Sequence, residues 1–444
     1  MRRPLQHPAR IVPLAFLGAI ALGTTVLMLP VSRAGPGSAP LLDAVFTATS
    51  AVCVTGLVVV DTPAYWSTFG QVVIVALIQI GGFGIMTMAT LLSLLVLRRL
   101  GLASRLVVAA ETHTLALGEV RRLLGWIALT VLVCESIVTT ALTLRFWLGY
   151  DYPIGRALWH GIFHAVSAFN NAGFALYSDN LIRFIRDWWL CLPIAAAVIV
   201  GGIGFPVLFE LRRHLRRLSR WSIHTRLTVA GTLILLAFGF VAVLTGEWDN
   251  PRTLGPLAVD DKVLAAFFQS VVPRTAGFQT IDYAVANLPT TLITDGLMFI
   301  GGGSAGTAGG IKLTTFFLLA YVIWAEVRGQ DDVIVGERRV SVPAQREALA
   351  VALLGVAAVT AGTLLLIEYT PRLRLDEALF ESVSAFATVG LSMNLTPTLP
   401  PSARVVLIIL MFVGRVGTIT AASALALTSR RTRYRYPEGR PIVG

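Results

Sequence analysis

Long apolar stretches alternate with short polar segments along this chain of 444 residues. A helix needs about 20 apolar residues to cross the hydrocarbon core of a membrane. Eight stretches reach or approach that length: 11–30, 69–97, 124–148, 188–209, 226–246, 292–325, 347–368 and 403–427. The pattern therefore predicts an all-α integral membrane protein with eight long spans.

Four shorter apolar segments lie between pairs of long ones, at about 41–52, 159–170, 263–273 and 376–387. At 1.5 Å per residue, a helix of about 12 residues measures roughly 18 Å, about half of the hydrocarbon core. Such helices cannot span, so we expect four re-entrant half-helices that enter the membrane and turn back. Irregular backbone at that depth is tolerated only inside protein or beside a watery cavity.

One motif marks each short segment: a phenylalanine, a glycine ten residues later, and then an apolar residue. The four copies run from Phe46 to Gly56, Phe163 to Gly173, Phe267 to Gly277 and Phe380 to Gly390. Constant spacing in four copies indicates duplicated modules. We therefore expect four fused helix–pore-loop–helix repeats around a central pore.

The repeats divide the chain into consecutive parts. These are repeat 1 (1–98), a cytoplasmic loop (99–123), repeat 2 (124–217), repeat 3 (218–328) with an intramembrane gate loop at 301–310, repeat 4 (329–429) and a cytoplasmic tail (430–444). Composition agrees with a membrane location, because 55% of the residues are hydrophobic and 14% are charged. Soluble proteins carry about 25% charged residues.

The formal net charge is +11, and most of the 36 lysines and arginines fall in alternate connecting segments. The positive-inside rule explains this distribution with both termini in the cytoplasm, so nucleic acid is not an expected partner. The basic amphipathic segment 210–226 leaves two interpretations open, contact with anionic lipid headgroups or docking of a cytosolic partner. Cys53, Cys134 and Cys191 show neither a disulfide framework nor metal-ligand spacing.

The turn at the end of each motif has the chemistry of an ion-selectivity filter. Backbone carbonyls can replace the hydration shell of a monovalent cation, and glycine allows the positive φ angles that turn carbonyls inward. The candidate ion-binding residues are Val54, Thr55, Gly56, Asn171, Ala172, Gly173, Thr275, Ala276, Gly277, Thr388, Val389 and Gly390. A single glycine of this kind would indicate an ordinary loop or a close helix contact, but four copies at one spacing favour a filter.

These motifs resemble those of the membrane subunits in the Trk/Ktr/HKT superfamily of cation transporters. The stretch 48–63 is especially similar to the first filter region of KtrB-type subunits, and the resemblance covers essentially the whole chain. It implies uptake of K+ across the bacterial cytoplasmic (inner) membrane, with a dependence on Na+. In this family, glycine instead of serine at position 56 goes with potassium selectivity. The first three filters depart from the Thr-Val-Gly pattern of tetrameric potassium channels, which only Thr388-Val389-Gly390 repeats, and this departure implies weaker selectivity.

The resemblance also implies partners. A homodimer with one pore per subunit would rest on a cytosolic ring of KtrA-like regulatory subunits that bind ATP or ADP. The chain itself has no strand–GxGxxG–helix unit, so we expect no nucleotide to bind to it. A secondary carrier with alternating access also uses broken helices, but it predicts two inverted halves. A membrane enzyme would need clustered intramembrane His, Asp or Glu, and we expect no enzymatic activity.

The long apolar stretch after the third motif is interrupted by glycines. The candidate gate residues are Gly301, Gly302, Gly303, Ser304, Gly306, Gly309, Gly310 and Lys312, together with Arg415 in the fourth repeat. A phosphate-binding loop does not fit, because Ile311 separates Gly310 from Lys312. The resemblance implies an intramembrane loop that blocks the pore until a regulator moves it. A merely structural break in the helix is the alternative.

Arg415 lies in an otherwise apolar stretch, at the place that Gly82, Gly202 and Gly302 take in the other repeats. An arginine inside a membrane costs about 2.5 kcal/mol or more, so it normally faces protein or water. One interpretation is a buried arginine that pairs with loop carbonyls. The resemblance implies a second role, an electrostatic barrier under the filter that contacts the 301–310 loop, and both can hold together.

Three other candidates are weaker. Glu135 fits a packing polar group better than a ligand of a coupling ion. Arg274 precedes the third filter, where it could brace the loop by pairing with Asp282. His160 and His164 have i, i+4 spacing, but the sequence offers no clear further ligand for a metal.

Overall fold

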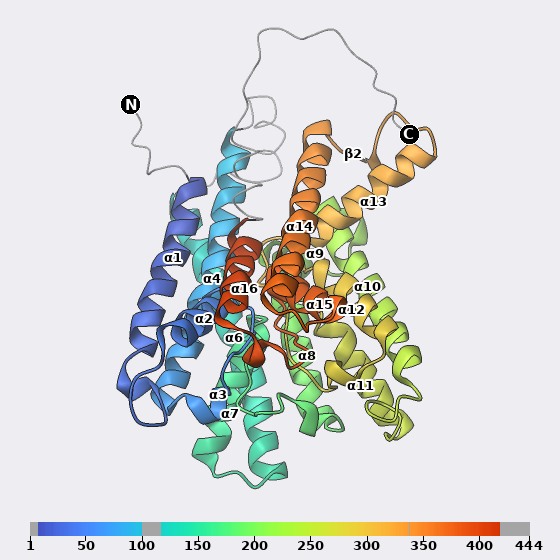
Figure 1. The fold of residues 1–444 in the computed structure, drawn as a ribbon. Coiled ribbons are helices and arrows are strands. Elements are labelled where there is room, and N and C mark those ends of the chain that lie inside the picture. The colour runs from blue at the N-terminus through green and yellow to red at the C-terminus, as the bar shows by residue number, and fades with distance from the viewer. Residues whose placement is uncertain (1–7, 100–116, 337, 418–444) are drawn as a thin grey trace.

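The computed structural model describes residues 8–99, 117–336 and 338–417. Most of these residues are helical, and the long helices run side by side along one direction of the molecule (Figure 1). Most of the expected loop at 99–123 lies outside the described residues. The same holds for residues 418–429 of repeat 4 and for the expected tail at 430–444.

In the part of the chain that the structure describes, five helices contain 20 or more residues. They are α1 (Pro8–Leu27), α4 (Thr68–Arg99), α6 (Leu117–Gly149), α10 (Ile223–Glu247) and α14 (Val342–Tyr369). Within the described residues, four segments are long and apolar enough to cross a membrane: Thr68–Thr87, Leu124–Gly149, Ile223–Glu247 and Val342–Tyr369. The number is five if the bent pair α8 (Trp188–Ile203) and α9 (Phe205–His214) counts as one span. The described chain therefore holds fewer unbroken spans than the eight expected.

The expected continuous span at 188–209 is interrupted, which corrects the sequence-based prediction. Helices α8 and α9 meet at Gly204 with a bend of 99°. Gly204 has a φ of +98°, a conformation that is rare for residues with a side chain. Pro206 follows in the first turn of α9, where the missing N–H of proline breaks no helical hydrogen bond. These two residues divide one apolar stretch into two helices.

The stretch 292–325 is divided, as its glycines predict, and the stretch 403–427 is described only as far as residue 417. The stretch 292–325 forms α12 (Leu288–Phe299) and α13 (Leu313–Val327), with a non-helical loop between them. Helix α16 (Pro401–Phe412) passes into a π-helical turn, η7 (Val413–Gly417), where the described residues end. Single π-helical turns are frequent at functional sites.

Four short helices occupy the places predicted for half-helices. They are α2 (Leu41–Val52), α7 (Ile154–Phe169), α11 (Val259–Val271) and α15 (Leu375–Phe386). Each packs against the long helix that precedes it in the chain, which is α1, α6, α10 and α14 respectively. The motif residues Phe46, Phe163 and Phe380 are completely buried. In the third copy Phe267 is partly buried and its neighbour Phe268 is buried.

The remaining elements are short connections. They are α3 (Thr62–Tyr65), the 3-10 turns η2 (Pro30–Ser32), η3 (Ile182–Phe184), η4 (Leu218–Arg220), η5 (Tyr283–Val285) and η6 (Thr396–Thr398), and the strands β1 (Ile334–Val335) and β2 (Arg338–Arg339). The two strands pair antiparallel, with Ile334 opposite Arg339.

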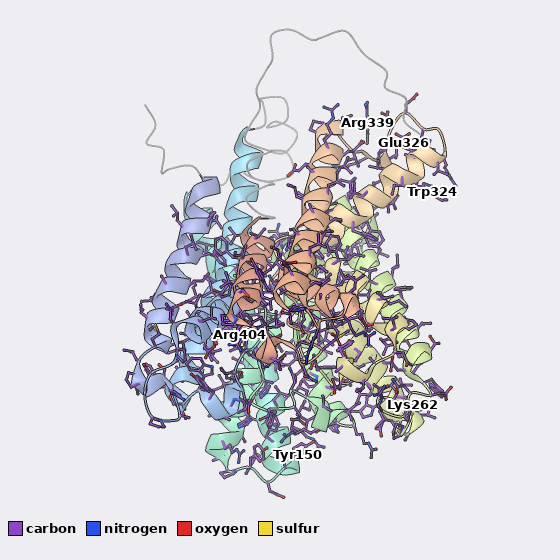
Figure 2. All side chains as sticks on the ribbon, viewed as in Figure 1. Tyr150, Lys262, Trp324, Glu326, Arg339 and Arg404 are labelled. Atoms are coloured by element: carbon purple, nitrogen blue, oxygen red, sulfur yellow. The ribbon has the colours of Figure 1, made fainter. Side chains whose placement is uncertain are left out.

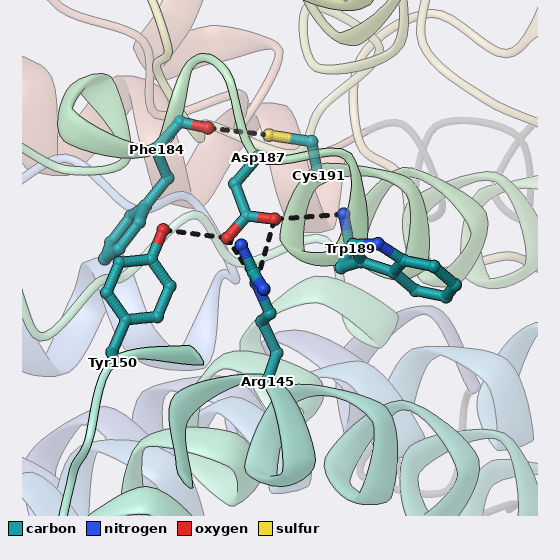
Figure 3. Close-up of polar contacts among 6 residues, drawn as sticks. All are labelled: Arg145, Tyr150, Phe184, Asp187, Trp189 and Cys191. Atoms are coloured by element: carbon teal, nitrogen blue, oxygen red, sulfur yellow. Dashed lines mark hydrogen bonds and ion pairs between the residues drawn. The ribbon is translucent and has the colours of Figure 1, made fainter. Parts of the chain in front are cut away.

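A buried carboxylate ties the start of α8 to the end of α6 (Figure 3). Asp187 accepts hydrogen bonds from Arg145 Nε and Tyr150 Oη, each at 2.8 Å. It also caps α8 by accepting from the Trp189 backbone N–H at 3.0 Å. Burial, and after it the hydrogen bond to Asp187, raises the pKa of the Tyr150 hydroxyl above its usual value.

The helices form a closed arrangement in which the last described part of the chain returns to the first. Contacts run from α2 through α4, α7, α8, α11, α10, α12, α15 and α16 back to α2. Arg404 lies where α16 meets α2 (Figure 2), and its Nη1 donates to Asp43 Oδ1 at 3.0 Å. The short helices thereby lie between the long ones and approach a common centre.

Large apolar side chains remain exposed on the long helices. Leu22, Leu132, Ile137, Leu233 and Leu364 each expose more than 60% of their surface. Exposed apolar surface on this scale marks contact with a membrane or a partner protein. It agrees with the expected membrane location.

Candidate functional site

Each short helix ends in a tight turn that contains two residues at positive φ. The first is Val54, Asn171, Thr275 or Thr388, with φ between 51° and 72°. The second is Gly56, Gly173, Gly277 or Gly390, with φ between 69° and 92°. A positive φ costs a residue with a side chain roughly 1–2 kcal/mol of conformational free energy. Contacts with the surrounding protein must therefore hold the four turns in this conformation.

The four turns meet one another in cyclic order. A Cβ atom added to any of their four glycines would contact a carbonyl oxygen of the next turn. These contacts join Gly56 to Ala172, Gly173 to Ala276, Gly277 to Val389 and Gly390 to Thr55. Only glycine fits at such close approach, so the four turns form a closed ring of backbone. We call this set, 54–56, 171–173, 275–277 and 388–390, the glycine ring.

Four carbonyl oxygens of the glycine ring have no hydrogen-bond donor within the described residues. Those of Thr55, Ala172, Ala276 and Val389 accept no hydrogen bond from any residue that the structure describes. Buried carbonyls are nearly always paired. A ring of unpaired carbonyls offers neutral oxygen ligands of the kind that coordinate a dehydrated monovalent cation.

A serine six residues before the glycine stabilises three of the four turns, in repeats 1, 2 and 4. Ser50 Oγ donates to the Leu57 carbonyl at 2.7 Å and accepts from the Gly56 N–H at 3.1 Å. Ser167 and Ser384 each make one of these two bonds in their own turns. These serines are not among the residues predicted from sequence. Their signal is a Ser-Ala pair at the same position in three motifs.

The 301–310 loop packs against the end of α8. The Gly303 N–H donates to the Gly202 carbonyl at 2.8 Å, and the Phe205 N–H donates to the Ala305 carbonyl at 3.4 Å. The ends of the loop are also joined, because the Gly301 N–H donates to an Ile311 carbonyl only 2.9 Å away. The two ends of the loop therefore lie side by side, and hydrogen bonds hold the loop against the protein where α8 ends.

The same loop reaches the glycine ring. A Cβ atom at Gly309 would contact the side-chain oxygen of Thr388 in the fourth turn. A Cβ atom at Gly303 would contact the Ile203 carbonyl. The glycines of the loop thus allow it to lie between α8 and the ring, where larger residues would not fit.

Two cationic side chains accompany the loop. Arg415 is 2% exposed, and its Nη1 donates to the Thr307 carbonyl. Its Nε and Nη2 have no hydrogen-bond partner among the described residues. Lys312 Nζ donates to the Ala308 carbonyl at 2.6 Å. Arg415 thus contacts the 301–310 loop through a carbonyl, and the loop carries no acidic residue to offset either charge.

The predicted pair between Arg274 and Asp282 is wrong. The Arg274 guanidinium donates to the carbonyl and the hydroxyl of Thr232 on α10, at 3.3 and 3.4 Å. Asp282 instead accepts from the Ala284 N–H and from Asn394. The carboxylate caps η5 and bridges to the segment after the fourth turn, so its hydrogen bonds are used elsewhere.

The remaining candidates have local roles. His164 uses both ring nitrogens, one with the His160 carbonyl at 2.8 Å and one with the Leu176 N–H at 3.3 Å. Among the described residues, no three His, Cys, Asp or Glu side chains could hold a metal ion together. Glu135 accepts a hydrogen bond at 3.1 Å from Nδ2 of Asn170, the residue directly before the second turn of the ring.

Exposed apolar helices around a ring of unpaired backbone carbonyls define a membrane protein of the cation-transport class. Comparison with known families agrees. The family model TrkH, described as a cation transport protein, matches residues 9–431. The chain therefore belongs to this family, which confirms the resemblance seen in the sequence and the expectation of a transporter instead of an enzyme.

Relatives of known name cover nearly the whole chain. The Ktr system potassium uptake protein B of Bacillus subtilis is 40% identical, over 98% of this chain and 97% of that protein. The potassium/sodium uptake protein NtpJ of Enterococcus hirae is 34% identical, with the same coverage of both chains. The crystal structure of the potassium transporter TrkH from Vibrio parahaemolyticus shares the fold. Its TM-score is 0.71 at 21% identity, over 96% of this chain and 86% of that one.

Proposed function

We propose that this chain is the potassium-conducting subunit of a Ktr-type uptake system in the bacterial cytoplasmic membrane. The observation that carries the proposal is the glycine ring with its four unpaired carbonyl oxygens. Neutral oxygens can replace water around K+ without trapping it. The names of two relatives, which refer to potassium and to potassium/sodium uptake, support K+ as the transported ion and Na+ as a second or coupling ion.

In this proposal the glycine ring is the selectivity filter of a central pore. Helices α2, α7, α11 and α15 are the re-entrant half-helices of four repeats, and their C-terminal ends direct partial negative charge toward the filter. The divided stretches α8–α9 and α12–α13 each count as one broken span, so the chain crosses the membrane eight times. An even number of crossings places both termini on the same side, the cytoplasm. The support is the same order of long helix, short helix and turn in each repeat.

The 301–310 loop is the gate, and it acts together with Lys312 and Arg415. The loop lies against the ring, and both cations are bonded to its carbonyls. Positive charge beside the conduction path repels K+, which limits flux at rest. Movement of the loop away from the ring would remove the obstacle.

Regulation comes from partners of this chain. The word system in the name of the Bacillus relative supports a second component, which we take to be a cytosolic KtrA-like ring that binds ATP or ADP under a homodimer. Anionic lipids are the partners of the basic segment after α9. The exposed arginines there support this: Arg216, Arg217 and Arg220 in the segment, and Arg212 and Arg213 in the last turn of α9.

Ion flux through purified protein in proteoliposomes tests the filter. We expect rubidium, a substitute for K+, to pass faster than sodium in the wild type. Gly56→Ser places a side chain at a φ of +91° against the Ala172 carbonyl. We expect it to lower the rubidium-to-sodium ratio on the order of tenfold, which corresponds to about 1.4 kcal/mol of discrimination.

Gly18→Ser is the matched control, since a Cβ atom at this exposed position of α1 meets no atom within 4 Å. It should behave as the wild type. Equal rubidium and sodium fluxes in the wild type, or an unchanged ratio in a folded Gly56→Ser protein, would refute the filter.

A further inference from the structure

Thr307 lies in the middle of the gate loop and is completely buried. Its N–H donates to the Gly201 carbonyl at 3.2 Å, and its carbonyl accepts from Arg415 Nη1. Its hydroxyl donates to the Phe169 carbonyl at 3.3 Å and lies 3.0 Å from the Asn171 side chain. One residue of the gate therefore joins α8, the buried arginine and the second turn of the filter.

Asn171 begins the second turn of the filter, with a φ of +59° and an exposure of 1%. With its amide nitrogen toward the loop, Asn171 donates to Thr307 Oγ1 at 3.0 Å. The same nitrogen then lies 3.3 Å from the carbonyls of Phe169 and Val198. In this orientation the Thr307 hydroxyl accepts from Asn171 and donates to Phe169, so neither polar group is left unpaired.

The other three turns make no such bond to the gate within the described residues. Val54 has no polar side-chain atom, and the hydroxyls of Thr275 and Thr388 have no hydrogen-bond partner there. The loop touches the fourth turn near Gly309, but only by packing. A hydrogen bond from gate to filter is therefore a property of the second turn.

We propose that Thr307 is a positioning residue that couples the gate to the ion preference of the filter. This inference rests on the proposed function. While the loop is closed, the Thr307 hydroxyl holds Asn171 and with it the backbone of the second turn. When the loop moves away, the turn loses that bond and discriminates ions less strictly. By linkage, an ion that favours the held turn also favours the closed loop by the same factor.

Thr307→Val tests this coupling, because valine keeps the shape of threonine and replaces the hydroxyl with a methyl group that forms no hydrogen bond. Rubidium and sodium fluxes of the full-length chain are measured in proteoliposomes without a regulatory partner. We expect the resting rubidium flux to rise roughly three- to tenfold, as the loss of one hydrogen bond allows. We also expect the rubidium-to-sodium ratio to fall. Thr307→Ser, which keeps the hydroxyl, should restore both values.

Thr314→Val is the matched control. The Thr314 hydroxyl lies 3.1 Å from Ser304 Oγ, so its removal loosens the same loop without touching the filter. We expect the ion ratio of Thr314→Val to equal that of the wild type. A looser loop alone would change the flux of Thr307→Val and Thr314→Val in the same way. The coupling therefore shows itself only in the rubidium-to-sodium ratio, which should fall in Thr307→Val and not in Thr314→Val.

A double-mutant cycle with Asn171→Gly isolates the bond itself. Glycine tolerates the positive φ of Asn171 and removes the side chain. Asn171→Gly alone should lower the ion ratio, which keeps the proposal testable if Thr307→Val does not fold. Added to Asn171→Gly, Thr307→Val should change the ratio no further.

Two results would overturn the coupling: an unchanged ion ratio in a folded Thr307→Val protein, or additive effects of the two substitutions. The test also separates this inference from the proposed function. If Gly56→Ser acts as expected and Thr307→Val does not, only the coupling fails. If Gly56→Ser leaves the ratio unchanged, the filter assignment fails first.

Discussion

Buried charges in this protein differ in how well their neighbours satisfy them. Glu247 and Glu381 are completely buried, and each accepts several hydrogen bonds, including one from the Asn287 N–H at 2.9 Å and one from Thr396 Oγ1 at 2.8 Å. Arg415 is buried as deeply, yet two of its nitrogens have no partner among the described residues. An unsatisfied buried charge costs stability. Neighbouring donors therefore satisfy the two glutamates, whereas Arg415 is only partly satisfied by the described residues.

Asp187 joins three hydrogen-bond donors, so its substitution should lower the stability of the protein. In Asp187→Asn, Arg145 loses its ion pair, and Tyr150 and Trp189 lose a charged acceptor. We expect the free energy of unfolding to fall by about 2 kcal/mol, the value of hydrogen bonds to a charged group. Thermal unfolding in detergent, followed by tryptophan fluorescence, measures the change.

The control for this prediction is Asp179→Asn. Asp179 pairs with Arg183, but the two side chains are 35% and 50% exposed. An exposed i, i+4 pair contributes about 0.5 kcal/mol or less. Equal destabilisation by both substitutions would contradict the special position of Asp187.

The sequence predicts single residues well where a local pattern exists, and poorly where a contact is distant. The four glycines follow from their spacing, because each lies ten residues after the phenylalanine of its motif. The partner of Arg274 does not follow, since Thr232 lies on another helix and carries no charge to suggest a pair. The bond between Thr307 and Asn171 has no sequence signal either, because it joins positions far apart in the chain.

At the level of helices, the short elements were the easier ones to predict. Helix α2 begins and ends at the expected residues, and α15 is shifted by one. A half-length apolar segment before a glycine is a local signal. The break at Gly204 is not, because a glycine in an apolar stretch also suits a continuous helix. It depends on the loop that packs there, where the Phe205 N–H meets the Ala305 carbonyl.

The 301–310 loop, the proposed gate, should tolerate shortening without separation of the helices on either side. The Gly301 N–H donates to the Ile311 carbonyl at 2.9 Å, and Ile300 pairs with Ile311, so the ends of the loop are adjacent. Deletion of 302–309 should leave α12 and α13 in place. We expect resting rubidium flux to rise on the order of tenfold or more, a change of at least about 1.4 kcal/mol in the barrier.

Rubidium uptake into proteoliposomes, normalised to the amount of folded protein, measures this effect of the deletion. The melting temperature provides the control, since it separates a gain in conduction from a loss of folded structure. A folded deletion protein that conducts no faster than the wild type would show that the loop does not limit flux.

Across the whole molecule, the helical fold and the family were recognisable from sequence, whereas the number of unbroken spans in the described residues was not. The motifs place the four glycines, and the structure brings their turns together. The closing contact between α16 and α2, with its Arg404–Asp43 pair, joins residues from opposite ends of the described chain. Contacts of that kind carry no local pattern.

Nucleotide control should require a partner of this chain. We expect ATP and ADP to leave the rubidium flux and the melting temperature of the purified chain unchanged. After a KtrA-like subunit is added, the same nucleotides should alter the flux. Titration of each nucleotide into proteoliposomes with and without the subunit measures this, and a response of the chain alone would contradict it.

The glycine ring comes from one polypeptide, and this has a genetic consequence. In a pore built from four identical subunits, one codon change alters all four walls together. Here the same change alters one turn of the ring and leaves three as they were. Selection can therefore give the turns different contacts, as with Asn171, whose side chain meets Thr307 of the 301–310 loop. A homotetramer would need gene duplication before it could acquire such a division of labour.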